Sequence, residues 1–338
     1  LNYHEFITFT FLQINIMLIN AGILNAIGEK VEYRQVEIHP QGKEVIVDLM
    51  ASSLNRRDLW IQEGKYARIK LPCIPGSDGA GRYEGRDIIL LPTINWGNSP
   101  AFQSAQFEIL GMPHHGCCAE KIAVHPSLIY PMPSHLDYNE AASLPLSGLT
   151  AWRALMTQAQ AKPGQNILIT GIGGGVASFV LQFAVAFGMH VYVTSGSDDK
   201  IIMAKSYGAK GGANYRNPEA FSELQTMAQG FDIIIDSAGG ADFHKLLKLA
   251  NFGAHIVIYG GTKGNIDSIN PQNLFWKQLT IKGSTMGTPE EFNDMLDFVN
   301  EHKVKPIIDK IFPLNQINEA FDYMISGSHF GKIVINHL

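Results

Sequence analysis

The distribution of apolar positions along the chain changes near residue 138. Before that point, short apolar runs such as residues 45–50 and 87–91 predict short β-strands, and Met17 is expected to open the first strand. Segments rich in Gly, Pro and Asn are predicted to form turns at residues 40–42, 75–79 and 96–100. Short strands separated by such turns favour a small barrel or sandwich.

After residue 138, predicted helices alternate with predicted strands. Helices are expected at residues 138–144, 149–160, 176–187 and 198–207, and apolar strands at residues 166–170, 190–194, 231–236, 255–259 and 279–283. Nearly continuous apolar strands separated by helices indicate a parallel sheet covered on both faces, which is the doubly wound α/β architecture. The tail, with predicted strands at residues 307–312 and 331–336, is expected to return and complete the first sheet.

Composition narrows the class of protein and of partner. A chain of 338 residues, 46% of them hydrophobic, is long enough for two domains. A net charge of −5 favours neither nucleic acid nor an anionic membrane as a partner. Three cysteines are too few for a disulfide framework and predict a reducing compartment, which we take as the cytoplasm.

The first 22 residues are strongly apolar, and a signal peptide is one interpretation of them. No Lys or Arg precedes the apolar run, and polar residues interrupt it, which argues against both a signal peptide and a membrane span. The favoured interpretation is a leader of unknown role at residues 1–16, followed by the folded chain.

The segment 167–177 is the most informative in the chain. Gly171, Gly174 and Ala177 give the spacing G-x-x-G-x-x-A after an apolar strand and at the start of a helix. Glycines let a pyrophosphate approach the backbone, and the helix N-terminus offers it free N–H groups. The candidate phosphate-binding residues are Gly171, Gly173, Gly174, Gly175 and Val176.

The end of the second predicted strand bears on which nucleotide binds. NAD sites place Asp or Glu there to bind the ribose 2′-hydroxyl. This chain has Ser195 instead, and Asp198 and Asp199 already belong to the next predicted helix, where they would stabilise its N-terminus. With Lys200 near enough to supply positive charge, the sequence favours NADP(H).

Taken in order, several motifs resemble the medium-chain dehydrogenase/reductase superfamily, specifically its zinc-independent quinone oxidoreductase-like branch. The similarity spans residues 17–338. It rests on residues 51–58 (ASSLNRRD), 75–81 (PGSDGAG), 146–151 (LSGLTA), the glycine segment, 236–240 (DSAGG) and 331–332 (GK).

The resemblance implies a β-rich GroES-like (chaperonin-10-like) catalytic domain from residues 17–148 and 285–338, and a Rossmann domain from residues 149–284. It implies contacts of Tyr215 near the adenosine 2′-phosphate, of Asn55 with the nicotinamide ribose, and of Gly260 and Gly261 beside the nicotinamide. Two residues of the matched motifs complete the expected cofactor site, namely Thr150 and Lys332.

Zinc-containing members of the superfamily carry metal ligands at the positions of Asn55, Ser77 and Leu146, and none of these is a normal zinc ligand. Residues 92–112 contain no cysteine, so the structural zinc lobe is missing as well. The segment 114–118 (HHGCC) is a rival metal site, but ligands so close in sequence cannot all converge on one ion. A turn leading into a strand at residues 119–124 is the favoured interpretation.

Without a metal, the chemistry must depend on hydrogen-bond donors and on placement of the hydride donor. The resemblance makes Tyr66, in the segment 62–66 (QEGKY), the first candidate, because the zinc-free branch often has a substrate-facing tyrosine there. A phenol can donate a proton to a carbonyl or enolate oxygen. Asn55 is the next candidate, and Tyr66 could also simply line the cavity. Arg57 stands where zinc alcohol dehydrogenases of the superfamily have a relay hydroxyl, and Trp60 could form an aromatic wall.

The resulting hypothesis is an NADPH-dependent, zinc-independent reductase of a small electrophile, namely a quinone, an enone or an activated carbonyl. Two alternatives stay open. One is an NADP-dependent alcohol or aldehyde dehydrogenase. The other is a non-enzymatic NADPH-binding protein. A homodimer is expected only by analogy with relatives.

Overall fold

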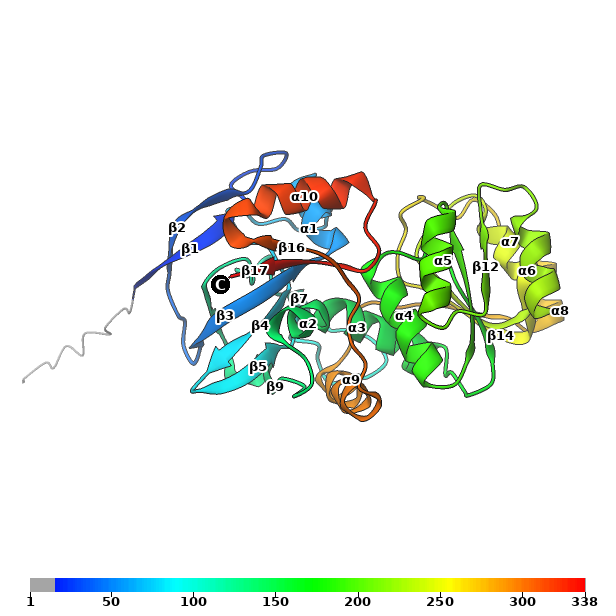
Figure 1. Ribbon diagram of the computed structural model, residues 1–338, viewed down its shortest axis with the longest axis horizontal. Helices are drawn as coiled ribbons and strands as arrows, with labels where there is room; N and C mark the ends of the chain where they lie inside the picture. The colour runs from blue at the N-terminus through cyan, green and yellow to red at the C-terminus, as the bar shows by residue number, and fades with distance from the viewer. Residues whose placement is uncertain (1–15, 338) are drawn as a thin grey trace, which may run out of the picture.

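The computed structural model describes residues 16–337, which form two halves lying side by side (Figure 1). One half contains a mixed β-sheet with strands from both ends of the chain, and the other contains a parallel sheet from its middle. The leader expected at residues 1–16 lies outside the described residues except for Ile16. Met17 opens β1 (Met17–Ile23), as expected.

The six strands of the second half form a wholly parallel sheet in the order β12-β11-β10-β13-β14-β15. The strands are β10 (Asn166–Ile169), β11 (His190–Ser195), β12 (Gly211–Asn214), β13 (Phe231–Asp236), β14 (Ala250–Ile258) and β15 (Thr280–Gly283). The chain proceeds outward from β10 on one side and from β13 on the other. The strand order therefore reverses between these two strands, at the position where ligands of such sheets bind.

Helices cover both faces of this sheet, as the apolar strands predicted. They are α4 (Gly175–Ala186), α5 (Asp198–Ser206), α6 (Ala220–Ala228), α7 (Phe243–Leu249) and α8 (Pro271–Lys277). Ile167 and Ile169 pack in one core cluster with residues of α4 and α5, and Leu168 between them packs in another cluster with α6 and α7. Alternate residues of one strand thus face opposite cores.

The β-rich half centres on a seven-stranded sheet in the order β16-β17-β3-β4-β5-β9, with β8 also paired to β3. Its strands are β3 (Val45–Leu54), β4 (Asp78–Tyr83), β5 (Arg86–Leu90), β8 (Lys121–Val124), β9 (Ile129–Pro131), β16 (Ile308–Pro313) and β17 (Lys332–Asn336). Two pairs flank it, namely β1 with β2 (Glu32–Ile38) and β6 (Thr93–Ile94) with β7 (Glu108–Ile109). Val334 of β17 pairs with Ser53 of β3, so the tail does complete the first sheet.

The remaining helices and short helical turns come from both ends of the chain and from the segment before β10. They are α1 (Arg56–Gln62), η1 (Pro126–Leu128), α2 (Tyr138–Ser143), α3 (Pro145–Trp152), η2 (Arg153–Gln158), α9 (Pro289–His302), η3 (Leu314–Gln316) and α10 (Ile317–Ser326). Figure 1 places α10 and α1 next to each other, although more than 250 positions separate them in the sequence.

The structure differs from the predicted elements at several places. Asp78 and Gly79, expected in a turn, already belong to β4, because their backbone pairs with Ser53 and Ser52 of β3. The helix expected from residue 149 begins at Pro145, where proline suits the first turn, and continues as the π-helix η2. Strand β12 was not predicted, because its sequence GGAN lacks the branched side chains that mark a strand.

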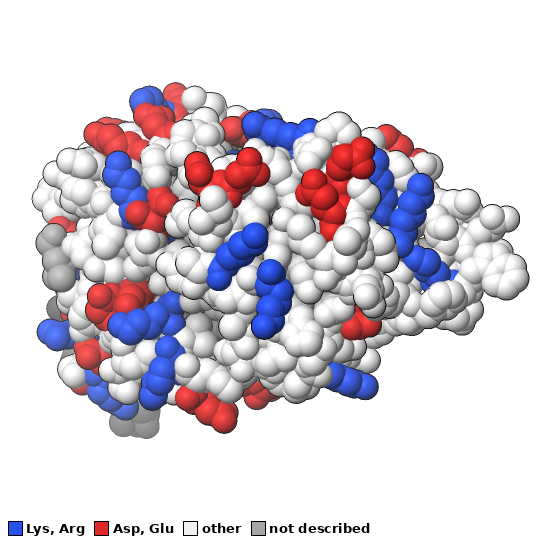
Figure 2. Space-filling view, turned by 45° about the vertical axis from the view of Figure 1, so that its right-hand side comes forward, with Lys and Arg blue, Asp and Glu red and all other residues white. Residues whose placement is uncertain are grey.

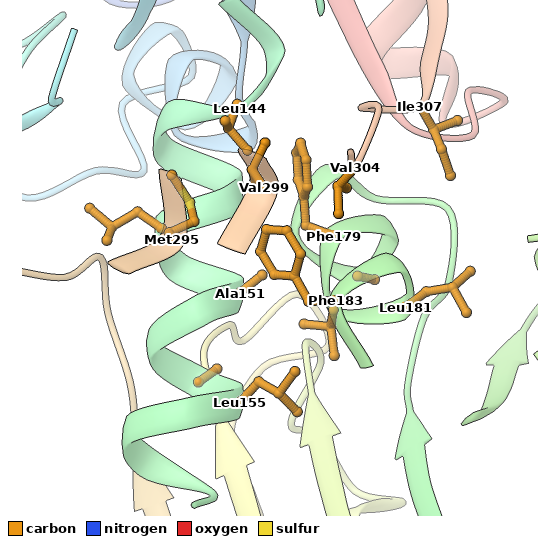
Figure 3. Packing of buried hydrophobic residues seen from close by; sticks show 14 of the residues in the cluster. Leu144, Ala151, Leu155, Phe179, Leu181, Phe183, Met295, Val299, Val304 and Ile307 are labelled. Carbon is orange, nitrogen blue, oxygen red and sulfur yellow. The ribbon is translucent and has the colours of Figure 1, made fainter. Parts of the chain in front are cut away.

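A shared core joins the two halves, and Figure 3 shows part of it. Phe179 and Phe183 of α4 point into the space between α3 and α9, where they meet Leu144, Ala151 and Val299. Phe183 makes edge contacts with Trp152 and Phe298, at ring-centroid distances of 6.0 and 5.8 Å. This packing holds α4, the helix after the glycine-rich turn, against the β-rich half.

The surface carries charged side chains of both signs (Figure 2). On the face drawn in Figure 2, basic and acidic side chains are interspersed and form no continuous basic patch. Within residues 16–337, no helix combines the length and apolar character needed to cross a membrane.

A buried ion pair joins η2 to α9. Arg153, only 2% exposed, donates from Nη1 to both carboxylate oxygens of Glu291, at 2.7 and 2.8 Å. Its Nη2 donates to the carbonyls of Pro100 and Ala101, both at 2.9 Å, and its guanidinium lies 4.8 Å from the ring centroid of Trp96. One arginine therefore anchors the loop around residue 100 and helix α9 together.

Replacing Arg153 by methionine should lower the free energy of unfolding by about 3–5 kcal/mol, because the Glu291 carboxylate would stay buried without its partner. Urea denaturation measures this loss. The control is Lys245→Met, which breaks the exposed pair with Asp242 and should cost less than about 1 kcal/mol. Equal losses in the two variants would contradict a structural role for the buried pair.

Candidate functional site

A cavity of about 960 Å³ lies between the two halves. Its walls include the carboxyl ends of β10, β11 and β13, the glycine-rich turn, helix α1 and the start of β17. The point where the strand order of the parallel sheet reverses therefore opens into the same space as the β-rich half.

The glycine-rich turn between β10 and α4 has the backbone that its sequence predicted. Gly171 and Gly173 have φ angles of +66° and +121°, which favour glycine, and Gly174 is the N-cap of α4. The N–H of Gly331 donates to the carbonyl of Gly173 at 3.0 Å, so the tail of the chain lies against the turn. The first amides of a twelve-residue helix thus border the cavity.

The end of β11 has no acidic side chain at the expected position. Ser195 is buried, and the Tyr215 hydroxyl lies so close to Gly196 that a Cβ there would be 2.7 Å away. The Lys263 ammonium lies 4.2 Å from the centroid of the Tyr215 ring. Arg216 also borders this corner, with its Nε 3.1 Å from the same Cβ position.

Arg216 was missed by the sequence analysis, although its place directly after Tyr215 was a usable signal. Lys200 also lines the cavity, but its ammonium donates to the carbonyl of Gly327 at 2.7 Å. Burial lowers the pKa of Lys200, and Asp309 opposes that effect. Asp198 accepts a hydrogen bond from Asn214 at 3.0 Å, which ties the start of α5 to β12.

The opposite end of the cavity is organised by the carboxylate of Asp78, which is fully buried. Its Oδ1 accepts from the backbone N–H of Leu146 at 2.7 Å. Its Oδ2 accepts from the Ser53 hydroxyl at 2.8 Å, from Asn55 Nδ2 at 2.8 Å and from the Lys332 ammonium at 3.0 Å. Strands β3, β4 and β17 and the N-terminus of α3 therefore share one acceptor.

This network orients the amide of Asn55. Its Oδ1 accepts from Lys332 at 2.7 Å and from the Ser147 hydroxyl at 3.0 Å, while its Nδ2 donates to Asp78. One Nδ2 hydrogen is left without an acceptor among the described residues. Lys332 also packs on the glycine-rich turn, since a Cβ on Gly175 would lie 2.8 Å from its Cδ.

Tyr66 and Arg57 lie together at this end of the cavity. The Arg57 guanidinium is 5.0 Å from the centroid of the half-buried Tyr66 ring. Arg57 Nη1 donates to the Ser77 hydroxyl at 2.7 Å and to the Leu110 carbonyl at 2.9 Å, and Nη2 donates to the Met112 carbonyl at 3.1 Å. The wall here is otherwise mainly apolar, and includes Trp60, Ile109, Leu146 and Met286.

The residues at the superfamily's zinc-ligand positions do not fit a zinc ion. The Asn55 amide is engaged with Asp78 and Lys332, the Ser77 hydroxyl accepts from Arg57, and Leu146 offers no side-chain donor atom. Two cationic side chains, Arg57 and Lys332, contact the residues at these positions, and both would repel a metal cation.

The segment 114–118 does not gather metal ligands either. His114 bonds to Glu108 at 2.7 Å, and His115 Nδ1 accepts from the N–H of Ile74 at 3.2 Å. Burial raises the pKa of the Cys117 thiol well above its usual range and that of Cys118 likewise, which disfavours the thiolate that zinc requires. Within residues 16–337, no group of three or more His, Cys, Asp or Glu could hold a metal ion.

Of the remaining expected site residues, three line the cavity and one does not. Val176 and Gly260 line the cavity, and Thr150 lines it with its hydroxyl bonded to the Leu146 carbonyl at 2.7 Å. Gly261, expected beside the nicotinamide, does not line the cavity. At Gly260 a Cβ would lie 2.6 Å from the Ser237 carbonyl, so that close approach requires glycine.

Comparison with known proteins identifies both halves. Residues 41–134 match the family model described as alcohol dehydrogenase GroES-like domain, and residues 175–301 match the one described as zinc-binding dehydrogenase. The expected architecture, a GroES-like domain with a Rossmann-like parallel sheet, is thereby confirmed.

Relatives match nearly the whole chain. The "zinc-type alcohol dehydrogenase-like protein YogA" of Leptosphaeria maculans is 35% identical over 327 residues, covering 88% of this chain and 91% of that protein. The crystal structure of an NAD-dependent alcohol dehydrogenase has a TM-score of 0.87 at 30% identity, covering 94% of this chain and all of that one. The quinone oxidoreductase of Thermus thermophilus, solved also with NADPH, has a TM-score of 0.79 at 26% identity, covering 94% and 100%. The chain belongs to the medium-chain dehydrogenase/reductase superfamily and is an oxidoreductase.

Proposed function

We propose that this protein reduces a quinone, an enone or an activated carbonyl with NADPH and without zinc. The observation that carries the proposal is the continuous cavity that joins the glycine-rich turn to Tyr66 and Asn55. A dinucleotide in its phosphate end would place the nicotinamide near the hydrogen-bond donors of the other end. The replaced zinc-ligand residues support chemistry that depends on those donors.

In this proposal, residues at one end of the cavity bind the cofactor and residues at the other end act on the substrate. The amides at the start of α4 receive the pyrophosphate, and Ser195, Lys200, Tyr215 and Arg216 surround the 2′-phosphate. When bound, the reduced nicotinamide supplies the hydride to the electrophilic carbon, and the substrate's π electrons move to its oxygen. Tyr66 donates its hydroxyl proton to that oxygen and regains one from solvent, so the product gains two hydrogens in total.

Known relatives support the cofactor assignment only in part. One similar structure is described as NAD-dependent, and another was solved with NADPH. The proposal of NADPH therefore depends on this chain's own residues, namely the neutral Ser195 and the nearby cations Lys200, Arg216 and Lys263.

Location and assembly form part of the same proposal. Cys73, Cys117 and Cys118 are free and buried, which suits the reducing cytoplasm. Strand β15 is an edge strand of the parallel sheet, and exposed Phe275 and Trp276 precede it, which supports a homodimer formed on that side.

Purified protein should contain no stoichiometric zinc, and a chelator should leave its activity intact. The reason is the engagement of Asn55 and Ser77 with cations and the aliphatic side chain of Leu146. Elemental analysis by mass spectrometry measures the metal content. One tightly held zinc per chain, with activity abolished by chelation, would falsify the zinc-free mechanism.

NADPH should be oxidised in preference to NADH in assays with quinones, enones and aldehydes. A charge-assisted hydrogen bond to a phosphate contributes about 1.5–3 kcal/mol, or roughly ten- to a hundredfold in affinity. Lys200→Ala and Arg216→Ala should therefore each weaken NADPH by about that factor and leave NADH nearly unchanged, as titration calorimetry measures.

Lys205→Ala is the matched control, because Lys205 lies on α5 with Lys200 but does not line the cavity. Equal loss of both cofactors in the Lys200 or Arg216 variant would remove that residue from the 2′-phosphate site. Absence of NADPH oxidation with every substrate class would contradict the proposed function and favour a non-enzymatic NADPH-binding protein.

Tyr66→Phe keeps the aromatic ring and deletes only the hydroxyl. If the hydroxyl is the proton donor, turnover of an enone or aldehyde should fall on the order of a hundredfold. NADPH affinity should scarcely change. Steady-state kinetics with a quinone, an enone and an aldehyde measures the effect, because a quinone can also take its proton from water. Unchanged turnover with all three would exclude Tyr66 as the acid.

A further inference from the structure

Arg57 has hydrogen-bond donors that the fold does not use. A guanidinium carries five N–H groups. Three hydrogen bonds, to Ser77, Leu110 and Met112, engage both hydrogens of Nη1 and one of Nη2. Nε is buried and has no acceptor among the described residues. Nε–H and one Nη2–H remain, and these two atoms share one edge of the planar group.

The positive charge of Arg57 also has no ion-pair partner among the described residues. The side chain is 7% exposed, yet no carboxylate oxygen of residues 16–337 lies within 4.0 Å of it. The neighbouring Asp58 carboxylate accepts instead from the backbone N–H groups of Asn55 at 2.7 Å and Gly76 at 3.1 Å. Burial raises the pKa of Asp58 and the positive charge of Arg57 partly opposes that rise, so the two groups attract each other without forming an ion pair.

The two other buried cations of the described chain are each neutralised by a carboxylate. Arg153 pairs with Glu291 at 2.7 Å, and Lys332 pairs with Asp78 at 3.0 Å. A buried cation without a carboxylate partner is costly, because its hydration is lost and only neutral groups replace it. Arg57 bears this cost in the wall of the cavity, next to the ring of Tyr66.

We infer that Arg57 binds the substrate oxygen on which negative charge develops during reduction. This inference rests on the proposed function and names the ligand chemistry of its substrate end, which is an enolate, a hydroquinone anion or an alkoxide. Arg57 does not give up a proton, so it supplies charge while Tyr66 supplies the proton. The largely apolar wall of Ile109, Leu146 and Met286 strengthens such a charge–charge contact.

The test measures binding of a stable oxyanion in place of turnover. The probe is 4-nitrophenolate, at a pH above its own ionisation, and 4-nitroaniline is the neutral analogue of similar shape. Both are titrated by calorimetry into the protein saturated with NADP⁺, where no hydride is available. The native protein should bind the phenolate about ten- to a hundredfold more tightly than the aniline.

Three variants separate charge from structure. Arg57→Met should lose the preference for the phenolate, and Arg57→Lys should keep part of it. Arg82→Met removes a positive charge from an exposed position of β4, outside the cavity, and should keep the whole preference. If circular dichroism shows that Arg57→Met does not fold, Arg57→Gln replaces it, because the glutamine amide still donates hydrogen bonds without the charge.

Any of three results would overturn the inference: no preference in the native protein, an intact preference in the neutral Arg57 variant, or an equal loss in Arg82→Met. Because binding of 4-nitrophenolate involves no hydride transfer, this result is independent of the activity assays. Failure of the protein to oxidise NADPH would contradict the proposed function and leave the binding result standing.

Discussion

The ion pair between Asp78 and Lys332 is the constraint on which the rest of the structure depends. Both side chains are buried, 254 positions apart in sequence, and all three ammonium hydrogens have acceptors in Leu54, Asn55 and Asp78 at 2.7–3.0 Å. Removing one partner of such a pair typically costs about 3–5 kcal/mol, because the other charge stays buried. The pair therefore holds β17 against β3 and β4 and keeps the tail of the chain in the β-rich sheet.

The same pair also orients side chains that line the cavity. It leaves the Asn55 amide a single orientation, because Oδ1 faces two donors and Nδ2 faces a carboxylate. Lys332 also packs on Gly175 at the start of α4, so the two ends of the cavity meet at one side chain. With α4 held by the aromatic core around Phe183, the two ends have little freedom to separate.

Under the proposed function, cationic side chains take the place of a metal ion at the substrate end of the cavity. The ammonium of Lys332 is neutralised within the fold, whereas the guanidinium of Arg57 has only neutral acceptors. Arg57 contacts Ser77 and Lys332 contacts Asn55, the residues at the positions where the superfamily's zinc ligands are expected. This arrangement suits a reaction in which a substrate oxygen gains charge in an apolar surrounding.

Local sequence determined the features that depend on neighbours in the chain. The glycine-rich turn, the strand before it and the helix after it follow from spacing within about twenty residues, since turn chemistry and helix starts are local. Apolar periodicity likewise determined the parallel strands and their two covered faces. The absence of zinc-ligand residue types at Asn55, Ser77 and Leu146 was also evident from sequence.

Tertiary structure alone decided what long-range contacts control. Asp78 looked like a turn residue, and only pairing with β3 made it part of a strand and the centre of a buried network. Strand β12 exists because β11 offers it backbone partners, not because its side chains favour extension. Several contacts also depend on groups far away in the sequence. They are the hydrogen bond of Arg57 to Leu110, the approach of Arg216 to Gly196 and the hydrogen bond of Lys200 to Gly327. A sequence shows which residue types are present. Whether a buried charge finds a partner is decided only when the chain folds, because the partner lies far away in the sequence.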